Sequence, residues 1–195
     1  MPIPPVPPSP IAAPIPSVAQ VFEILATGGS TAYHGEPVSV LEHSLQAAHF
    51  VEQHGAPPTL IAAALLHDLG HLLHSEGEDA AQHGLDTRHE ALAFAALAGH
   101  LPDAVLIPIE QHVAAKRYLC FAEKDYFNSL SPASVESLDL QGGPMTAAEA
   151  EAFLTSPHAQ ASLALRRADD AAKVQGLDVP ALDTYRPLLA SLWIG

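Results

Sequence analysis

The sequence is short of cationic side chains and of cysteine, and each shortage excludes a class of protein. It holds 8 Lys+Arg against 22 Asp+Glu, a formal net charge of −14 at pH 7. So acidic a chain repels phosphate backbones and anionic lipid surfaces, and we expect it to bind neither nucleic acid nor a membrane. Its one cysteine, Cys120, excludes a disulfide framework and a Cys-rich zinc site, and it fits the reducing cytoplasm.

Long apolar runs are also missing. No stretch reaches the roughly 18 apolar residues that span a bilayer. The N-terminal segment lacks the basic region and unbroken apolar core of a signal peptide. Residues 1–16 instead carry eight prolines, which are incompatible with a helix. We therefore predict a disordered proline-rich arm over 1–16 and a single domain over 17–195.

Histidine, in contrast, is abundant. The 12 histidines outnumber the 8 lysines and arginines together. Imidazole is the commonest metal ligand in proteins and the usual proton carrier near neutral pH. The composition therefore favours a metal site or an acid–base site.

Helix signals follow one another along the whole chain. Residues 58–73 are apolar on nearly all sides, which indicates a buried central helix. Residues 37–54 have apolar side chains at helical spacing, and Thr87 to Glu90 reads as a capping box that opens another helix. Further helix starts are indicated at Ser17, Ser131, Thr146 and Ser156. No alternating strand pattern and no internal repeat interrupts them, so the predicted fold class is all-α, a helical bundle.

The pair His67-Asp68 lies inside the most apolar of these predicted helices. Burying both side chains without partners costs several kcal/mol. One interpretation is a hydrogen-bonded core pair. The other is a metal pair, in which adjacent His and Asp side chains approach one ion and the Asp bridges to a second. This helix alone does not decide between them.

Four other predicted helices supply further candidate ligands, as in metal sites that are assembled inside helical bundles. These candidates are His43, His89, His112 and Asp169. The order His … His-Asp … His … His … Asp resembles the HD-domain superfamily, and the two additional histidines are typical of its dinuclear members. The sequence therefore favours a dinuclear metal site at the centre of the bundle.

Two cations accompany these ligands. Lys116 stands four residues after His112, on the same helix face and about 6 Å along the axis. Arg166 stands three residues before Asp169, again on one face. Both could be ordinary surface charges, but we favour an anion clamp, because a phosphate-like substrate on a metal pair needs such donors.

Longer motifs narrow the resemblance. They are Tyr33-His34-Gly35-Glu36, Leu41 to Gln46, Leu65 to His71, His89-Glu90, His112 to Leu119, Leu130 to Ser134, Gln141 to Met145, and Arg166 to Asp170 with Lys173. Over residues 18–190 the chain resembles the HD-domain mixed-valence di-iron oxygenases of the PhnZ/TmpB type. The resemblance implies two iron ions, Fe(II) and Fe(III), and O2-dependent cleavage of the carbon–phosphorus bond of a 1-hydroxyalkylphosphonate. The best-known substrate of that family is (R)-1-hydroxy-2-aminoethylphosphonate, which gives glycine and phosphate.

The same resemblance implies roles for individual residues. One iron would be held by His43, His67, Asp68 and Asp169, and the other by Asp68, His89 and His112. Lys116, Ser134 and Arg166 would bind the phosphonate. Tyr33 and Glu36 would form a mobile lid that meets the substrate amine, with His71 near the substrate. The residues themselves leave alternatives open, because Tyr33 and Glu36 can also be a loop pair without a role and His71 a satisfied core histidine.

Two other functions use the same residues. An HD phosphohydrolase would act on a nucleotide or another phosphate ester through a metal-activated water, and a metal-dependent sensor or scaffold would catalyse nothing. Ligand spacing does not separate iron from manganese, zinc or nickel. Among hydroxyphosphonates we expect the primary amine, because Glu36 suits an ammonium group and Tyr33 is the sole Phe, Tyr or Trp in that motif, too few for an aromatic cage. The sequence leaves the oligomeric state open.

Overall fold

The computed structural model describes residues 13–33, 35–74 and 83–195, and within them every regular element is helical. One isolated backbone bridge, between Ala32 and Ser39, joins the two sides of a loop. The predicted all-α class is therefore confirmed. No helix among the described residues is both long enough and apolar enough to cross a membrane.

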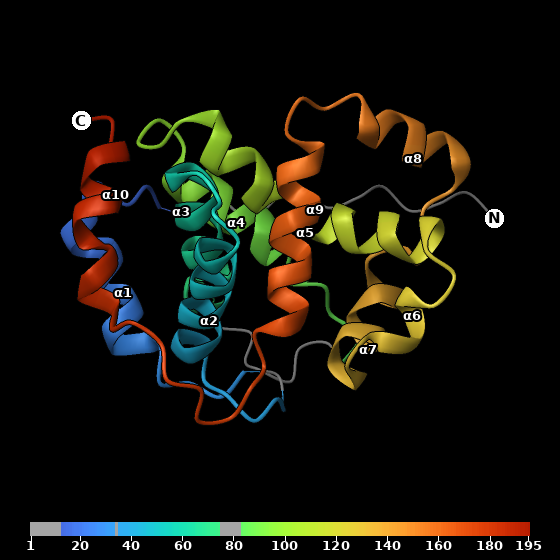
Figure 1. Cartoon of the computed structure of the whole chain (residues 1–195), viewed down its shortest axis with the longest axis horizontal. Coiled ribbons are helices and arrows are strands. Elements are labelled where there is room, and N and C mark those ends of the chain that lie inside the picture. The colour runs from blue at the N-terminus through green and yellow to red at the C-terminus, as the bar shows by residue number, and fades with distance from the viewer. Residues whose placement is uncertain (1–12, 34, 75–82) are drawn as a thin grey trace.

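The centre of the molecule is a bundle of helices that pack directly on one another (Figure 1). They are α2 (Val40–Gln53), α3 (Pro58–Leu66), α4 (His89–Leu97), α5 (Asp103–Ala122) and α9 (Ala159–Ala171). Helix α3 contacts α2, α5 and α9 at once, and every residue from Leu60 to Leu66 is buried. This is the environment that an all-round apolar helix requires.

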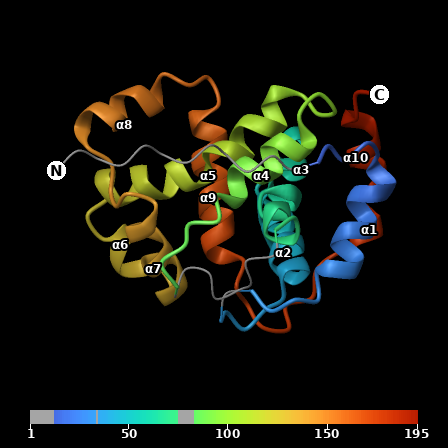
Figure 2. The same ribbon diagram turned by 180° about the vertical axis from the view of Figure 1, so that it is seen from behind.

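Smaller helices cover the two ends of this bundle. At one end lie α1 (Val18–Gly28), the short 3-10 helix η3 (Leu182–Tyr185) and α10 (Arg186–Leu192); at the other lie α6 (Tyr126–Ser129), α7 (Pro132–Leu140) and α8 (Ala147–Leu154). The view from behind shows the same two groups at opposite ends (Figure 2). Helices α6 and α8 both contact α5, so the long α5 carries the second group.

Most helix starts follow the capping signals, and two do not. The start predicted at Ser156 is wrong, because α9 begins at Ala159 with His158 as its N-cap residue. The side chains of Ser17, Ser131 and Thr146 each accept a backbone hydrogen bond at the start of α1, α7 and α8. The capping box predicted at Thr87 is wrong, because α4 begins at His89 and its N-cap residue Arg88 is left-handed, with φ 51° and ψ 42°. The Arg88 N–H donates to Asp86 Oδ1 at 3.1 Å instead, which turns the chain just before the helix.

The predicted proline-rich arm lies mostly outside the described residues, which begin at residue 13. Residues 13–16 are not helical, as their prolines require. They are not free of the domain, however, since Ile15 is 2% exposed and its N–H donates to Ala96 O at 2.8 Å. The apolar Ile15 side chain packs into the core and anchors this segment.

Candidate metal centre

The central helix ends where its two most polar residues occur. A continuous helix over 58–73 is predicted, but α3 stops at Leu66, His67 and Asp68 form a turn, and the 3-10 helix η1 (Leu69–Leu72) follows. In an unbroken α-helix neighbouring side chains diverge by about 100°. The turn instead lets both point to one place, with His67 Nε2 3.4 Å from Asp68 Oδ2.

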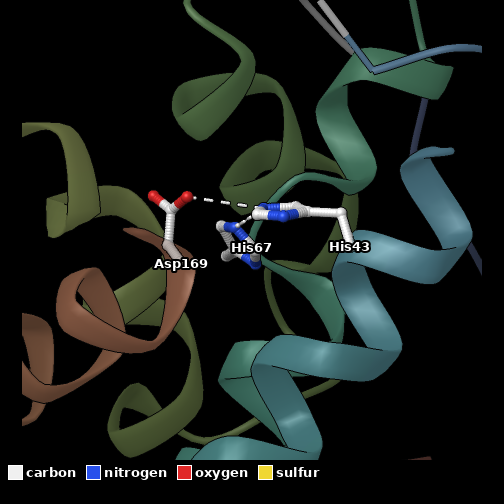
Figure 3. Close-up of side chains that lie close together, drawn as sticks. All are labelled: His43, His67 and Asp169. Atoms are coloured by element: carbon white, nitrogen blue, oxygen red, sulfur yellow. Dashed lines mark hydrogen bonds and ion pairs between the residues drawn. The ribbon is translucent and has the colours of Figure 1, made fainter. Parts of the chain in front are cut away.

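All six predicted ligands meet at this turn, and none is more than 9% exposed. They come from α2 (His43), the turn after α3 (His67 and Asp68), the start of α4 (His89), α5 (His112) and α9 (Asp169). Figure 3 shows His43 and Asp169 pointing toward each other from α2 and α9, with the His67 ring beside them. The structure therefore brings together every candidate ligand that the sequence indicated.

The two oxygens of Asp68 face two different pairs of histidines. Oδ2 lies 3.4 Å from Nε2 of His43 and 3.4 Å from Nε2 of His67. Oδ1 lies 3.4 Å from Nε2 of His89 and 3.6 Å from Nε2 of His112. A carboxylate that turns one oxygen to each of two imidazole pairs is placed to bridge two ions. Asp169 Oδ1 joins the first pair, at 3.4 Å from His43 Nε2.

Backbone carbonyls orient three of the imidazoles. The Nδ1 atoms of His43, His67 and His112 lie 2.8, 2.9 and 2.7 Å from the carbonyl oxygens of Ala172, Ala64 and Ile109. Because a carbonyl only accepts, each Nδ1 carries a proton and each ring turns its Nε2 toward the centre. This second hydrogen bond is the one that metal-binding histidines usually make.

The spacing of these nitrogen atoms fits a bound cation. Nε2 of His43 and Nε2 of His67 are 3.1 Å apart, and Nε2 of His89 and Nε2 of His112 are 3.0 Å apart. Two lone pairs this close repel one another unless a metal ion or a proton lies between them. Two ligand atoms at about 2.1 Å from one ion and at right angles are about 3.0 Å apart. In addition, the buried Asp68 Oδ2 has no hydrogen-bond partner. The residues therefore fit two metal ions.

Charge balance at the centre also favours metal binding. Burial by itself would raise the pKa of Asp68, but the neighbouring His67 and His43 hold that pKa well below its usual range. Burial and the nearby His67 lower the pKa of His112 to about 4, so that ring is neutral. Burial would lower the pKa of His43, yet Asp169 and Asp68 raise it to about 9, so a metal ion there competes with a proton.

Tyr33 and His71 cover the centre. The Tyr33 ring stacks on His43 with centroids 4.1 Å apart and meets His71 edge-on at 6.1 Å. His71 in turn stacks on His89 at 4.0 Å, and its Nε2 lies 3.9 Å from Asp68 Oδ1. One ligand atom each of Asp68, His71 and His89 lies within 4.8 Å of the others, so His71 is also close enough to contact an ion. Burial and then Asp68 raise the pKa of Tyr33, which keeps the phenol neutral.

Gly70 sets how closely α4 approaches η1. A Cβ atom at Gly70 would lie 1.9 Å from the carbonyl oxygen of His89, far inside van der Waals contact. The first residue of α4 therefore rests directly on backbone that has no side chain. This close approach holds His89 against the His67-Asp68 turn.

The two cations of the predicted anion clamp are both buried beside the centre, but they have different partners. Lys116 is buried, and its Nζ donates to Ser137 Oγ at 2.8 Å and to Ser134 O at 3.4 Å. Burial and then Arg166 lower the pKa of Lys116 to about 7. Nη1 of Arg166 lies 2.7 Å from Asp169 Oδ2, so this guanidinium orients a candidate metal ligand as well as facing Ser134.

Sequence reasoning missed the contacts of two residues. Tyr126 donates to Asp170 and accepts from Arg166 Nε at 3.1 Å, which fixes the guanidinium from its other side. Lys173 Nζ lies 3.1 Å from Ser134 Oγ and 3.2 Å from Glu36 Oε1. A signal for Lys173 was available, since it stands seven residues after Arg166, close to two helical turns.

A small cavity opens above the centre. Its volume is about 80 Å³, room for roughly five to eight water-sized groups. All predicted catalytic and substrate-binding residues line it, namely Tyr33, Glu36, His71, Lys116, Ser134 and Arg166, together with Lys173. A cavity of this volume has room for a compact anion.

Curated proteins include relatives that match most of the chain. It is 47% identical over 170 residues to hydroxymethylphosphonate dioxygenase of Gimesia maris, which covers 86% of this chain and 84% of the relative. It is 40% identical over 161 residues to 1-hydroxy-2-(trimethylamino)ethylphosphonate dioxygenase (glycine-betaine-forming) of Leisingera caerulea, with 83% and 82% covered. An uncharacterized protein of Acanthamoeba polyphaga mimivirus is 34% identical over 178 residues, with 90% and 81% covered. No protein-family model matches the chain.

Proposed function

Because the chain belongs to the family of hydroxyphosphonate dioxygenases of the PhnZ type, we propose that it cleaves the carbon–phosphorus bond of a short 1-hydroxyalkylphosphonate with O2. One observation above all supports this reaction: Asp68 turns an oxygen to each of two histidine pairs at the floor of a small cavity that Lys116, Arg166 and Lys173 also line. The reaction consumes one O2 and balances without an outside reductant. One of its oxygen atoms enters the carboxylate product, and the other enters phosphate.

We propose iron as the metal at both positions. Imidazole with carboxylate suits iron among other borderline ions, and the six ligands are too many for one tetrahedral site. The bound iron pair would supply O2 activation and the redox change. In addition, we place the reaction in the cytoplasm, which the single cysteine fits.

The chain's own side chains would bind and orient the substrate. Lys116 and Ser134 would donate to the phosphonate oxygens from one wall of the cavity. Arg166 would hold Asp169 in place while its Nη2 faces the same oxygens. Tyr33, which lines the cavity and stacks on His43, would exclude water from the carbon that reacts.

Among hydroxyphosphonates we propose (R)-1-hydroxy-2-aminoethylphosphonate as substrate, with glycine and phosphate as products. Glu36 places a carboxylate on the cavity wall, and its side chain is only 12% exposed. A primary ammonium has three donors for such a carboxylate. Tyr33 is the one Phe, Tyr or Trp among the described lining residues, which is too little aromatic surface to enclose a trimethylammonium group.

Hydroxymethylphosphonate is the second candidate, and two observations favour it. The Gimesia maris relative, 47% identical, is named for that compound. Glu36 is also already paired with Lys173 at 3.2 Å, so the cavity does not need an ammonium group for charge balance.

Removing oxygen separates the proposed reaction from hydrolysis. With purified iron-loaded protein and a hydroxyphosphonate, we expect phosphate release to stop under strict anaerobic conditions and to resume when air is readmitted. A hydrolase uses water and continues at the same rate. Phosphate release that persists without O2, or turnover of a phosphate monoester in the same assay, would exclude the oxygenase.

The variant Glu36→Gln distinguishes the two substrates. We expect kcat/KM for the 2-amino compound to fall about tenfold or more, because a charge-assisted hydrogen bond is lost. Turnover of hydroxymethylphosphonate should not fall, since that compound has no ammonium group. Phosphate release from both compounds and from the trimethylated analogue, assayed side by side, is the measurement. A wild type that prefers either amine-free or trimethylated substrate contradicts the proposed substrate.

A further inference from the structure

Three of the chain's 8 lysines and arginines gather around one serine. The carbonyl oxygen of Ser134 accepts a hydrogen bond from Lys116 Nζ. Its Oγ accepts hydrogen bonds from Arg166 Nη2 and Lys173 Nζ. The charge of Arg166 is offset by Asp169 and Asp170. Like charges brought together in a cavity need anions nearby, and a phosphonate would supply them.

The backbone on both sides of Lys173 is fixed by α2. His43 Nδ1 donates to the carbonyl oxygen of Ala172 at 2.8 Å. The buried Gln46 amide donates to Val174 O at 2.8 Å and accepts from Val174 N at 3.0 Å. Lys173 therefore extends from a held segment, and its freedom lies in the side chain alone.

That side chain connects the two halves of the cavity. Its Nζ lies 3.1 Å from both Ser131 Oγ and Ser134 Oγ on the phosphonate side, and 3.2 Å from Glu36 Oε1 on the other. Side chains of Lys173 and Glu36 are each 12% exposed, so water screens their charges only in part. The ammonium therefore contacts both sides in one conformation.

We propose that Lys173 is a third anchor of the substrate's phosphonate and determines which class of hydroxyphosphonate the cavity accepts. This inference rests on the proposed function. A substrate with both phosphonate and ammonium offers a partner to Lys173 and to Glu36, so their ion pair is exchanged for two new ones. An amine-free substrate offers a partner only to Lys173, which must then neutralise Glu36 and the phosphonate together.

The substitution Lys173→Gln tests this role, because it leaves Glu36 as an unneutralised carboxylate facing the phosphonate. We expect affinity for hydroxymethylphosphonate to fall about 30-fold or more. The loss of affinity for the 2-amino compound should be about ten times smaller, because its ammonium replaces the lost charge. In the double variant Glu36→Gln/Lys173→Gln, hydroxymethylphosphonate should bind better than in Lys173→Gln. Anaerobic calorimetric titration of the iron-loaded protein measures binding without turnover, and the exposed Lys124→Gln is the matched control.

Each outcome has one meaning. The role of Lys173 would be overturned if Lys173→Gln lowered the affinity for both compounds equally and the double variant regained none of it. It would also be overturned if Lys173→Gln left both affinities unchanged. Should Lys173→Gln not fold, Glu36→Gln alone decides, because a freed Lys173 should tighten hydroxymethylphosphonate binding; weaker or unchanged binding overturns the inference. A wild type that binds neither phosphonate instead refutes the proposed function.

Discussion

Replacing Asp68 by Ala is expected to remove both metal ions and all measurable phosphate release. Among the described residues Asp68 is the one carboxylate that both histidine pairs share, with Oδ2 3.4 Å from His67 Nε2 and Oδ1 3.4 Å from His89 Nε2. Without it, each pair keeps its imidazoles but loses the common negative charge. Iron content per chain should fall from about two to near zero, because His89 and His112 keep no carboxylate ligand and the ion at His43, His67 and Asp169 loses the negative charge that Asp68 shares with it.

The matched control for this prediction is Asp169→Ala. Asp169 approaches only the pair formed by His43 and His67, with Oδ1 3.4 Å from His43 Nε2. Its loss should therefore weaken one ion and leave about one per chain. Metal analysis and electron paramagnetic resonance of both variants measure this difference. Equal and complete metal loss from both, or a single tightly bound zinc in the wild type, would contradict the bridging role of Asp68.

Lys116→Ala and Arg166→Ala are expected to fail in different ways. The sequence alone predicts that both substitutions raise KM and leave the metal content unchanged. In the structure Lys116 contacts hydroxyl and carbonyl groups, so its loss should raise KM for a hydroxyphosphonate about tenfold or more with iron content unchanged. Arg166 orients Asp169 and pairs with Asp170, so its removal leaves carboxylates without their partner.

Arg166→Ala should therefore also lower iron content and destabilise the fold by about 3–5 kcal/mol, the usual effect of breaking a buried ion pair. Urea unfolding, metal analysis and KM on the same preparations separate the two patterns. Tyr126→Phe is an informative companion, because it removes only the hydroxyl that touches Arg166 Nε at 3.1 Å. If the alanine variants of Lys116 and Arg166 show the same iron content and the same KM, the distinction drawn from their contacts is wrong.

The clustering of the candidate ligands was predictable because their order along the chain resembles the HD-domain pattern, and helical spacing adds which residues share a face. His112 and Lys116, four residues apart, must share a face of α5, and both indeed line the cavity. The break after Leu66 was not predictable, since the run of apolar residues continues through it and only tertiary contacts reward a turn at His67-Asp68. Left-handed Arg88 is another case, because such a backbone costs energy that only its surroundings repay.

Contacts between segments that are distant in the sequence could not be predicted either. Glu36 and Lys173 are far apart in the sequence, and they meet only because α2 holds the segment that follows α9. Periodicity fixes which residues share a face of a helix, but not which faces meet. For the same reason the pairing of Arg166 with Asp169 followed from spacing, whereas its contact with Tyr126 did not.

The close packing at Gly70 limits which substitutions this sequence can accept. Most buried positions tolerate an added or removed methyl group, because neighbouring side chains rearrange. At Gly70 the obstacle is the His89 carbonyl oxygen, 1.9 Å from any added Cβ, and a backbone atom cannot rotate away. A residue that coordinates nothing and touches no substrate is thereby as restricted as a ligand. Mutational robustness around this centre is therefore lowest where the chain has no side chain at all.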